Sequence, residues 1–199
     1  MALIDAAAVK KLREMTSAGI MDCKSALAEA GGDFDKAATL LREKGIASAA
    51  KKADRVAAEG RIEVYVHTDR KQAALVEVNC ETDFVAKTED FGQLCRDLAM
   101  QVVAMSPQYV RREDVPAEVL EAEKSIYTQQ AAGEGKPEAI QERIAEGRLN
   151  KFYGQVCLME QPFIRDDKKT VEQLINEAIG KLGENIRIAR FTRYKVGEA

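Results

Sequence analysis

The sequence has 199 residues, 46% of them hydrophobic, and its 30 Lys and Arg nearly balance 33 Asp and Glu to leave a net charge of −3. This composition is typical of a globular protein with a core of ordinary size, in one domain with a small second one at most. The charge balance excludes a basic footprint for nucleic acid, and no segment approaches the roughly 20 apolar residues of a membrane span. The N-terminus also lacks the pattern of an export signal, so we expect a cytoplasmic protein with no membrane and no direct nucleic-acid partner.

Residue types that build metal and nucleophilic sites are scattered along the chain. The four cysteines form no C-x-x-C pair and His67 is the single histidine, which disfavours a zinc site and favours reduced, mostly buried thiols. The alternating run around His67 indicates a sheet face rather than a catalytic centre. The stretch GEGKP at 133–137 lacks the spacing of a phosphate loop. The sequence therefore predicts no metal, no cofactor and no enzymatic chemistry.

Residues 1–54 predict a small bundle of three amphipathic helices followed by a linker. We expect Asp22 to cap the second helix, Asp35 to cap the third and Gly45 to stop it. The next stretch, IASAAKKADRVAAEG, is rich in Ala, Lys and Glu and has no Pro and no Gly before residue 60. This composition predicts a helical, semi-rigid linker.

Residues 55–199 predict an α+β core that begins with a β-hairpin. Within 61–105, the alternating runs RIEVYVHT and AALVEVNC are joined by the polar connection DRKQ, which predicts two antiparallel strands. Thr88 then caps a helix whose apolar stripe consists of Phe91, Leu94, Cys95, Leu98 and Val102.

The later core supplies helices and a third strand. Pro116 and Pro137 suit first helical positions and open two helices over 116–160, which predict a projecting helical hairpin. Over 170–199 we expect a helix after Thr170 and a last strand, IRIARFTRYKV, with a phase shift that suggests a bulge. The predicted fold is thus α+β, with a bundle, a helical linker and a three-stranded antiparallel sheet with helices and a helical hairpin.

Two apolar spots have no evident role in this fold. One is the pair Ile20 and Met21 at the first turn of the second helix, and the other is Phe84, beside Asp83 in the stretch TDFV. Composition alone favours a structural interpretation, in which Met21 fills the bundle core and Phe84 caps the sheet. The other interpretation is that these side chains fill pockets of a partner.

Around these residues the chain resembles bacterial elongation factor Ts over nearly its whole length. The stretch KLREMTSAGIMDCKSALAEAGGDFDKAATLLREKG is similar to the ubiquitin-associated-like N-terminal domain of that family, AAKKADRVAAEG to its linker, and VEVNCETDFVA to its signature loop. GKPEAI, LNKFYGQVCLMEQPFI and GENIRIARFTRYKVGE are similar to the later core. The resemblance implies a guanine-nucleotide exchange factor for elongation factor Tu, and it favours the partner interpretation of Phe84.

The resemblance also implies roles for individual residues. The exchange loop would consist of Thr82, Asp83, Phe84 and Val85, with the Asp-Phe pair entering the G domain of elongation factor Tu near its magnesium and phosphate site. The bundle would dock on another face of the same G domain through Leu12, Arg13, Ile20, Met21 and Lys24. Ile20 stands where the family often has methionine, and it keeps an apolar side chain of similar volume.

The chain also departs from the long members of that family. It has one compact core without a duplicated core or a C-terminal helical extension, so we expect a short form. A single three-stranded sheet has a face or an edge to cover, which makes a homodimer a reasonable hypothesis. Two alternatives stay open: a non-catalytic ubiquitin-associated-like adaptor that binds through residues 1–55 alone, and an enzyme built on Cys80 or Cys95.

Overall fold

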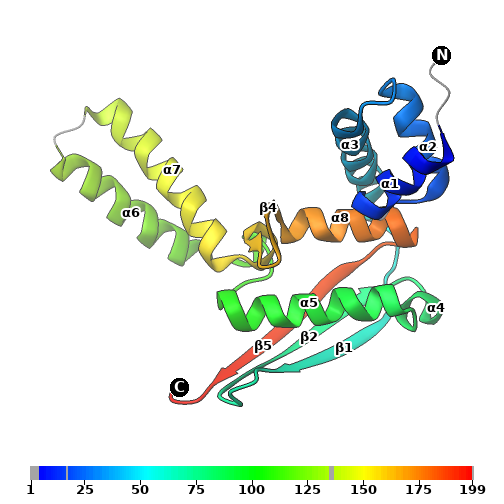
Figure 1. Ribbon diagram of the computed structural model, residues 1–199. Helices are drawn as coiled ribbons and strands as arrows, with labels where there is room; N and C mark the ends of the chain where they lie inside the picture. The colour runs from blue at the N-terminus through cyan, green and yellow to red at the C-terminus, as the bar shows by residue number, and fades with distance from the viewer. Residues whose placement is uncertain (1–4, 17, 135–136, 199) are drawn as a thin grey trace. The chain divides into compact units, whose positions relative to one another are not determined.

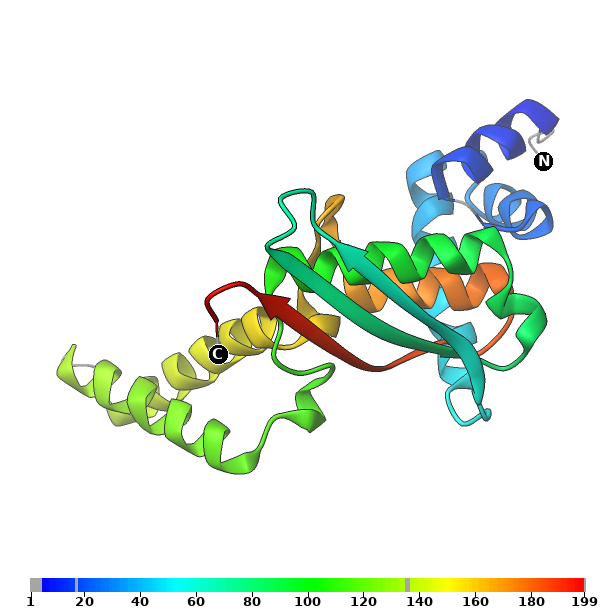
Figure 2. The same ribbon diagram turned by 90° about the horizontal axis from the view of Figure 1, so that it is seen from below.

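The computed structural model describes residues 5–16, 18–134 and 137–198. Its main sheet has three strands in the order β1, β2, β5, with bounds Glu59–Val66, Gln72–Cys80 and Arg187–Lys195 (Figure 2). The hairpin of β1 and β2 closes with a hydrogen bond from His67 N to Gln72 O, and Val196 N donates to Lys71 O beside the other edge of β2. The predicted α+β fold with a three-stranded antiparallel sheet is confirmed.

The chain forms two compact units. The first comprises residues up to Ile62, Glu77–Cys95 and Gln173–Arg187, and it contains the N-terminal bundle and the short helix α4 (Asp83–Ala86). The second comprises Glu63–Val76, Arg96–Glu172 and residues from Ile188 onward, and it contains the helical hairpin. The predicted exchange loop and the predicted docking residues of the bundle therefore all lie in the first unit.

Helices α1 (Ala6–Thr16), α2 (Ile20–Glu29) and α3 (Phe34–Lys52) form the predicted bundle (Figure 1). The bundle encloses a small core made of Val9, Leu12, Cys23, Ala26, Leu27 and Ala37. The predicted helix caps are wrong, because Gly19 precedes α2 and Asp22 lies in its first turn. Asp33 rather than Asp35 caps α3, since its carboxylate accepts hydrogen bonds from Asp35 N at 3.0 Å and Lys36 N at 3.1 Å.

Gly45 does not stop α3, which continues to Lys52. The reason is a helix crossing within the first unit: a Cβ on Gly45 would lie 3.5 Å from the carbonyl oxygen of Asn176 in α8 (Val171–Leu182). A Cβ on Gly180 would in turn lie 3.6 Å from the Cα of Gly45. The glycine therefore serves close helix packing. The linker prediction is correct as far as Lys52 and wrong beyond it, because residues 53–58 form a turn and an irregular connection.

The sheet buries one face under α5 (Glu89–Met105) (Figures 1 and 2). In β2 the residues that alternate toward this face are all buried, namely Ala74, Val76, Val78 and Cys80. The predicted apolar stripe of α5 is buried too, and Thr88 accepts a hydrogen bond from Phe91 N at 3.2 Å, as expected of a cap. In β5 the more buried side changes parity between Ile188 and Phe191, in agreement with the predicted phase shift.

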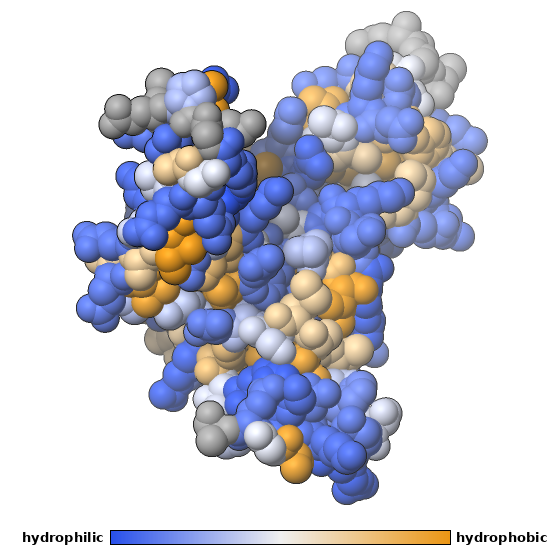
Figure 3. Space-filling view, turned by 90° about the vertical axis from the view of Figure 1, so that its left-hand side faces the viewer, coloured by the Kyte–Doolittle hydropathy of each residue, from blue (hydrophilic) through white to orange (hydrophobic). Residues whose placement is uncertain are grey.

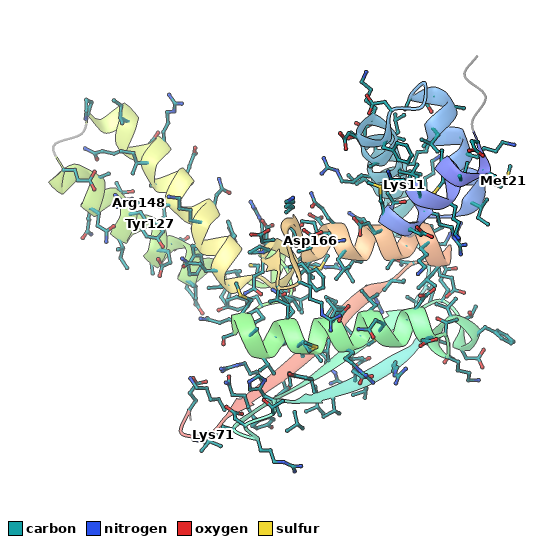
Figure 4. The ribbon with its side chains drawn as sticks, viewed as in Figure 1. Lys11, Met21, Lys71, Tyr127, Arg148 and Asp166 are labelled. Atoms are coloured by element: carbon teal, nitrogen blue, oxygen red, sulfur yellow. The ribbon has the colours of Figure 1, made fainter. Side chains whose placement is uncertain are left out.

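The predicted helical hairpin consists of α6 (Ala117–Gly133) and α7 (Glu138–Val156), which lie side by side in the second unit (Figure 1). Pro116 and Pro137 occupy the N-cap positions, one residue before the predicted ones. Arg148 of α7 donates to Gln130 at 2.6 Å and to Glu134 at 2.7 Å in α6 (Figure 4). On the face seen in Figure 3, hydrophilic residues predominate and hydrophobic ones form small patches between them.

A small ribbon of β3 (Pro162–Phe163) and β4 (Asp166–Thr170) was not predicted, because its strands are too short to show alternation. It is fastened by two buried glutamines. Gln101 Nε2 donates to Gln161 Oε1 at 3.2 Å, and Gln101 Oε1 accepts from Ile164 N at 2.9 Å. Two 3₁₀ turns, Arg112–Asp114 and Leu158–Glu160, flank the hairpin base, and α8 begins directly after Thr170 as predicted.

Candidate functional site

The predicted exchange loop forms the N-cap and the first three residues of α4. Thr82 has an extended backbone, with φ −129 and ψ 153, and its Oγ1 accepts a hydrogen bond from Val85 N at 3.4 Å. Just before it, the buried thiol of Cys80 donates to the Thr82 carbonyl at 3.2 Å. The last residues of β2 and the cap thus set where the short helix starts.

Phe84 is the second residue of α4, and 80% of its surface is exposed. The interpretation in which this ring caps its own sheet is therefore wrong. Both neighbours in the loop, Asp83 and Val85, are only half-buried, so the ring is the most exposed part of the loop. The arrangement presents one large apolar side chain to the solvent on a capped backbone.

Asp83 forms an ion pair with Lys87 one helical turn later, at 2.6 Å between Oδ2 and Nζ. The hydrogen bond from Lys87 is the main cause that lowers the pKa of Asp83, and the same bond raises the pKa of Lys87. The carboxylate therefore stays ionised and acceptor-only next to the exposed ring. A partner's group that binds Asp83 has to compete with Lys87.

Glu184, in the turn between α8 and β5, binds the start of the exchange loop. Its Oε2 accepts hydrogen bonds from Glu81 N and Thr82 N, both at 3.0 Å, and its Oε1 accepts from Thr82 Oγ1 at 2.6 Å. No pattern in the sequence predicted this role. A carboxylate in a turn gives no sequence signal for partners about 100 residues away.

Asn185 connects the same turn to the end of the linker. Its backbone N donates to Glu81 Oε1 at 2.7 Å, and its side-chain amide donates to the carbonyls of Ala53 at 3.2 Å and Arg55 at 2.8 Å. The Arg55 guanidinium completes the network with an ion pair to Glu81 at 3.5 Å. The exchange loop and the start of the segment 53–58 therefore share one anchor, a feature that sequence analysis also missed.

Four of the five predicted docking residues of the bundle are exposed. Met21 is 72% exposed and Ile20 57% exposed, which excludes the interpretation that Met21 fills the bundle core (Figure 4). Arg13 and Lys24 are exposed as well. Leu12 is fully buried in the bundle core, so the predicted direct contact is not available to its side chain in this conformation. Leu12 instead supports the helix that carries Arg13.

The burial of the cysteines weighs against nucleophilic chemistry. All four are buried, and burial is the main cause that raises the pKa of Cys80 and raises that of Cys157 to about 11. A raised pKa keeps a thiol protonated, whereas a nucleophilic cysteine needs a lowered one. These observations weigh against an enzyme built on Cys80.

Within residues 5–16, 18–134 and 137–198, no group of three or more His, Cys, Asp or Glu is arranged to hold a metal ion. None of the helices in those same ranges combines the length and the apolar character needed to cross a membrane.

Comparisons with known proteins agree with the resemblance seen in the sequence. The model of the family described as Elongation factor TS matches residues 5–198. Elongation factor Ts of Desulforamulus reducens is 59% identical over 198 residues, covering 100% of this chain and 91% of that protein. Elongation factor Ts of Moorella thermoacetica is 60% identical over 196 residues, covering 98% of this chain and 97% of that protein.

Proposed function

Since the chain belongs to the elongation factor Ts family and is a translation elongation factor, we propose that it binds elongation factor Tu and promotes the release of GDP. The observation that carries this proposal is the exposure of Phe84. This side chain is 80% exposed on the capped helix α4, and the protein's own fold does not bury it. Nucleotide exchange makes no covalent bond, so it calls for a binding surface rather than for catalytic groups.

The exchange loop acts on the magnesium and phosphate site of the partner. Phe84 enters an apolar pocket of the G domain, and Asp83 competes for the groups that hold the ion and the phosphates. An anion placed near the phosphates also raises the cost of retaining GDP, because like charges repel. If the factor prefers the empty G domain by a given ratio, the affinity of that domain for GDP falls by the same ratio.

The bundle provides a second attachment to the same G domain. Its predicted docking residues include the exposed apolar side chains of Ile20 and Met21 and the exposed cations Arg13 and Lys24. Two attachments to one partner reinforce each other when the connection between them keeps their separation. The bonds of Asn185 to the carbonyls of Ala53 and Arg55 support such a connection.

The direct test mixes the protein with elongation factor Tu that carries a fluorescent GDP and follows GDP release by stopped flow. We expect the release rate to rise with the concentration of the factor to a plateau. The adaptor alternative predicts binding by residues 1–55 alone, without effect of substitutions in TDFV. A release rate equal to that of elongation factor Tu alone would refute the proposal.

A homodimer remains a second proposal, and one face of the sheet supports it. In Figure 2 the sheet lies in front of α5, so the face turned toward the viewer is the one opposite that helix. Within the second unit the exposed apolar side chains of the strands are Val64 and Val66, both 53% exposed, Leu75 at 40% and Tyr194 at 66%. Exposed apolar residues gathered on one face are typical of an interaction surface. A monomer in light scattering at micromolar concentration would exclude the dimer.

The division into an N-terminal domain of residues 1–54 and a core of residues 55–199 is likewise a proposal. It is supported by the end of α3 at Lys52 and the irregular backbone of 53–58. Limited proteolysis should then cut first within 53–58 and leave a stable C-terminal fragment. A first cut inside α3 would contradict this division.

A further inference from the structure

We propose that Glu184 is a positioning residue of the exchange loop, which fixes the direction of Phe84 through the cap residue Thr82. This inference rests on the proposed function, because it assigns a role to Glu184 in the same exchange reaction. The carboxylate of Glu184 accepts three hydrogen bonds from Glu81 and Thr82, the two residues directly before α4.

The carboxylate is matched to this segment at both oxygens. One oxygen accepts the two consecutive backbone N–H groups of Glu81 and Thr82, and the other accepts the Thr82 hydroxyl at the short distance of 2.6 Å. Hydrogen bonds to an ionised acceptor are shorter and stronger than neutral ones. Together they fix both the backbone and the side chain of Thr82.

The direction of the hydrogen bond between the Thr82 hydroxyl and this carboxylate is fixed. An ionised carboxylate cannot donate, so the hydroxyl donates to Glu184 and keeps its lone pairs for Val85 N at 3.4 Å. Donating to an anion also polarises the hydroxyl oxygen and strengthens it as an acceptor. Glu184 therefore acts on the cap of α4 through Thr82.

The exposed ring depends on this cap more than a ring on a long helix would. Helix α4 has only four residues, and helices of that length do not persist by themselves in water. Phe84 is 80% exposed and has little packing of its own to hold its direction. The orientation of the ring is therefore set by the anchored cap. If the cap is loosened, the ring is still present, but docking then has to order it, which costs conformational entropy.

The experiment measures the plateau rate and the half-saturating concentration of stimulated GDP release. Glu184→Gln keeps the size of the side chain but places an amide opposite donors, and Thr82→Val removes the hydroxyl at nearly constant volume. We expect each to lower the plateau rate about tenfold, the size of one charge-assisted hydrogen bond. The double variant should be no slower than the single ones. Thr82→Ser, which keeps the hydroxyl, should restore most of the rate.

The matched control is Glu142→Gln, the same charge change at an exposed position of α7. It should leave the rate unchanged. Melting curves followed by circular dichroism separate a loosened loop from a general loss of stability. If Glu184→Gln does not fold, Glu184→Asp takes its place in the same comparison, because it keeps the charge but withdraws the carboxylate from Thr82 by one methylene, and the same loss of plateau rate is expected.

A second measurement follows the ring itself. The chain contains no tryptophan, so Phe84→Trp introduces a single probe at the loop. We expect faster local depolarisation of its fluorescence when Glu184→Gln is added, and no change when Glu142→Gln is added. Unchanged depolarisation together with a wild-type plateau rate for Glu184→Gln would overturn the inference.

The outcomes separate this inference from the proposed function. If the wild-type protein does not stimulate GDP release, the proposed function fails. If the wild type stimulates release and Phe84→Ala slows it, while the effects of Glu184→Gln and Thr82→Val simply add, the function stands. The positioning role of Glu184 through Thr82 is then refuted.

Discussion

Phe84→Ala is the sharpest test of the exchange loop, because the free protein has little to lose from it. The ring is 80% exposed, so truncation should change the free energy of unfolding by less than about 0.5 kcal/mol. Burial of a whole Phe side chain in a partner is worth roughly 1.5–3 kcal/mol. Since 80% of the ring is still available, docking would gain about 1.2–2.4 kcal/mol, and we expect stimulated GDP release to slow about 7- to 60-fold.

The assay is stopped-flow release of fluorescent GDP from elongation factor Tu, with circular dichroism melting curves for each variant. Ile126→Ala serves as the control, because it truncates another exposed apolar side chain, on α6 of the second unit. Phe84→Leu should fall between the wild type and Phe84→Ala, since it keeps part of the apolar volume. A wild-type release rate for a well-folded Phe84→Ala would show that the ring does not take part in exchange.

Four further predictions concern the surfaces and anchors around the loop. Met21→Lys should raise the half-saturating concentration about tenfold without lowering the plateau rate, and a lowered plateau in stopped flow would contradict a pure docking role. The ion pair between Asp83 and Lys87 should persist at pH values above the lowered pKa of Asp83 and should open as the pH falls below that pKa. Lys87→Met should return the pKa of Asp83 toward 3.8 in a carboxyl-carbon NMR titration. Asn185→Ala should lower the free energy of unfolding by about 1–3 kcal/mol in urea denaturation, because two backbone carbonyls lose a buried donor. A change below about 0.5 kcal/mol, the size of a surface effect, would refute this prediction. Val66→Lys should convert a dimer into a monomer in light scattering, and a dimer that persists would show that this sheet face is not the interface.

Local patterns predicted the elements of this fold well, because their signals lie within a few residues. The alternation in β1 and β2 and the apolar stripe of α5 gave the correct types of element. The wrong predictions concern residues that suit two different structural roles. Gly45 is a helix stop by local preference, but a close crossing with Gly180 decides its role, and that neighbour is remote in sequence.

The candidate site was predictable only in its outward-facing part. The exposure of Phe84 and Met21 agrees with the resemblance, because such side chains are recognisable in a motif. Leu12 matches the same motif and is buried, since helical spacing alone does not distinguish the core face from its edge. The supports of the loop, Glu184 and Asn185, were missed because hydrogen bonds between distant segments leave no periodic signal.

The energy of exchange requires more than the exposed ring. Moving an equilibrium from 1:99 to 99:1 takes about 5.5 kcal/mol of differential binding, and a buried Phe supplies at most roughly 3 kcal/mol. The remainder has to come from a wider docking surface, and that energy acts on the nucleotide site only if the two attachments are held at a set separation. The Glu184–Asn185 turn meets this requirement locally, since it binds the exchange loop at Thr82 and the end of the linker at Arg55. Under the proposed function, binding energy gained by the bundle would then be transmitted to Phe84 instead of being lost in a loose connection.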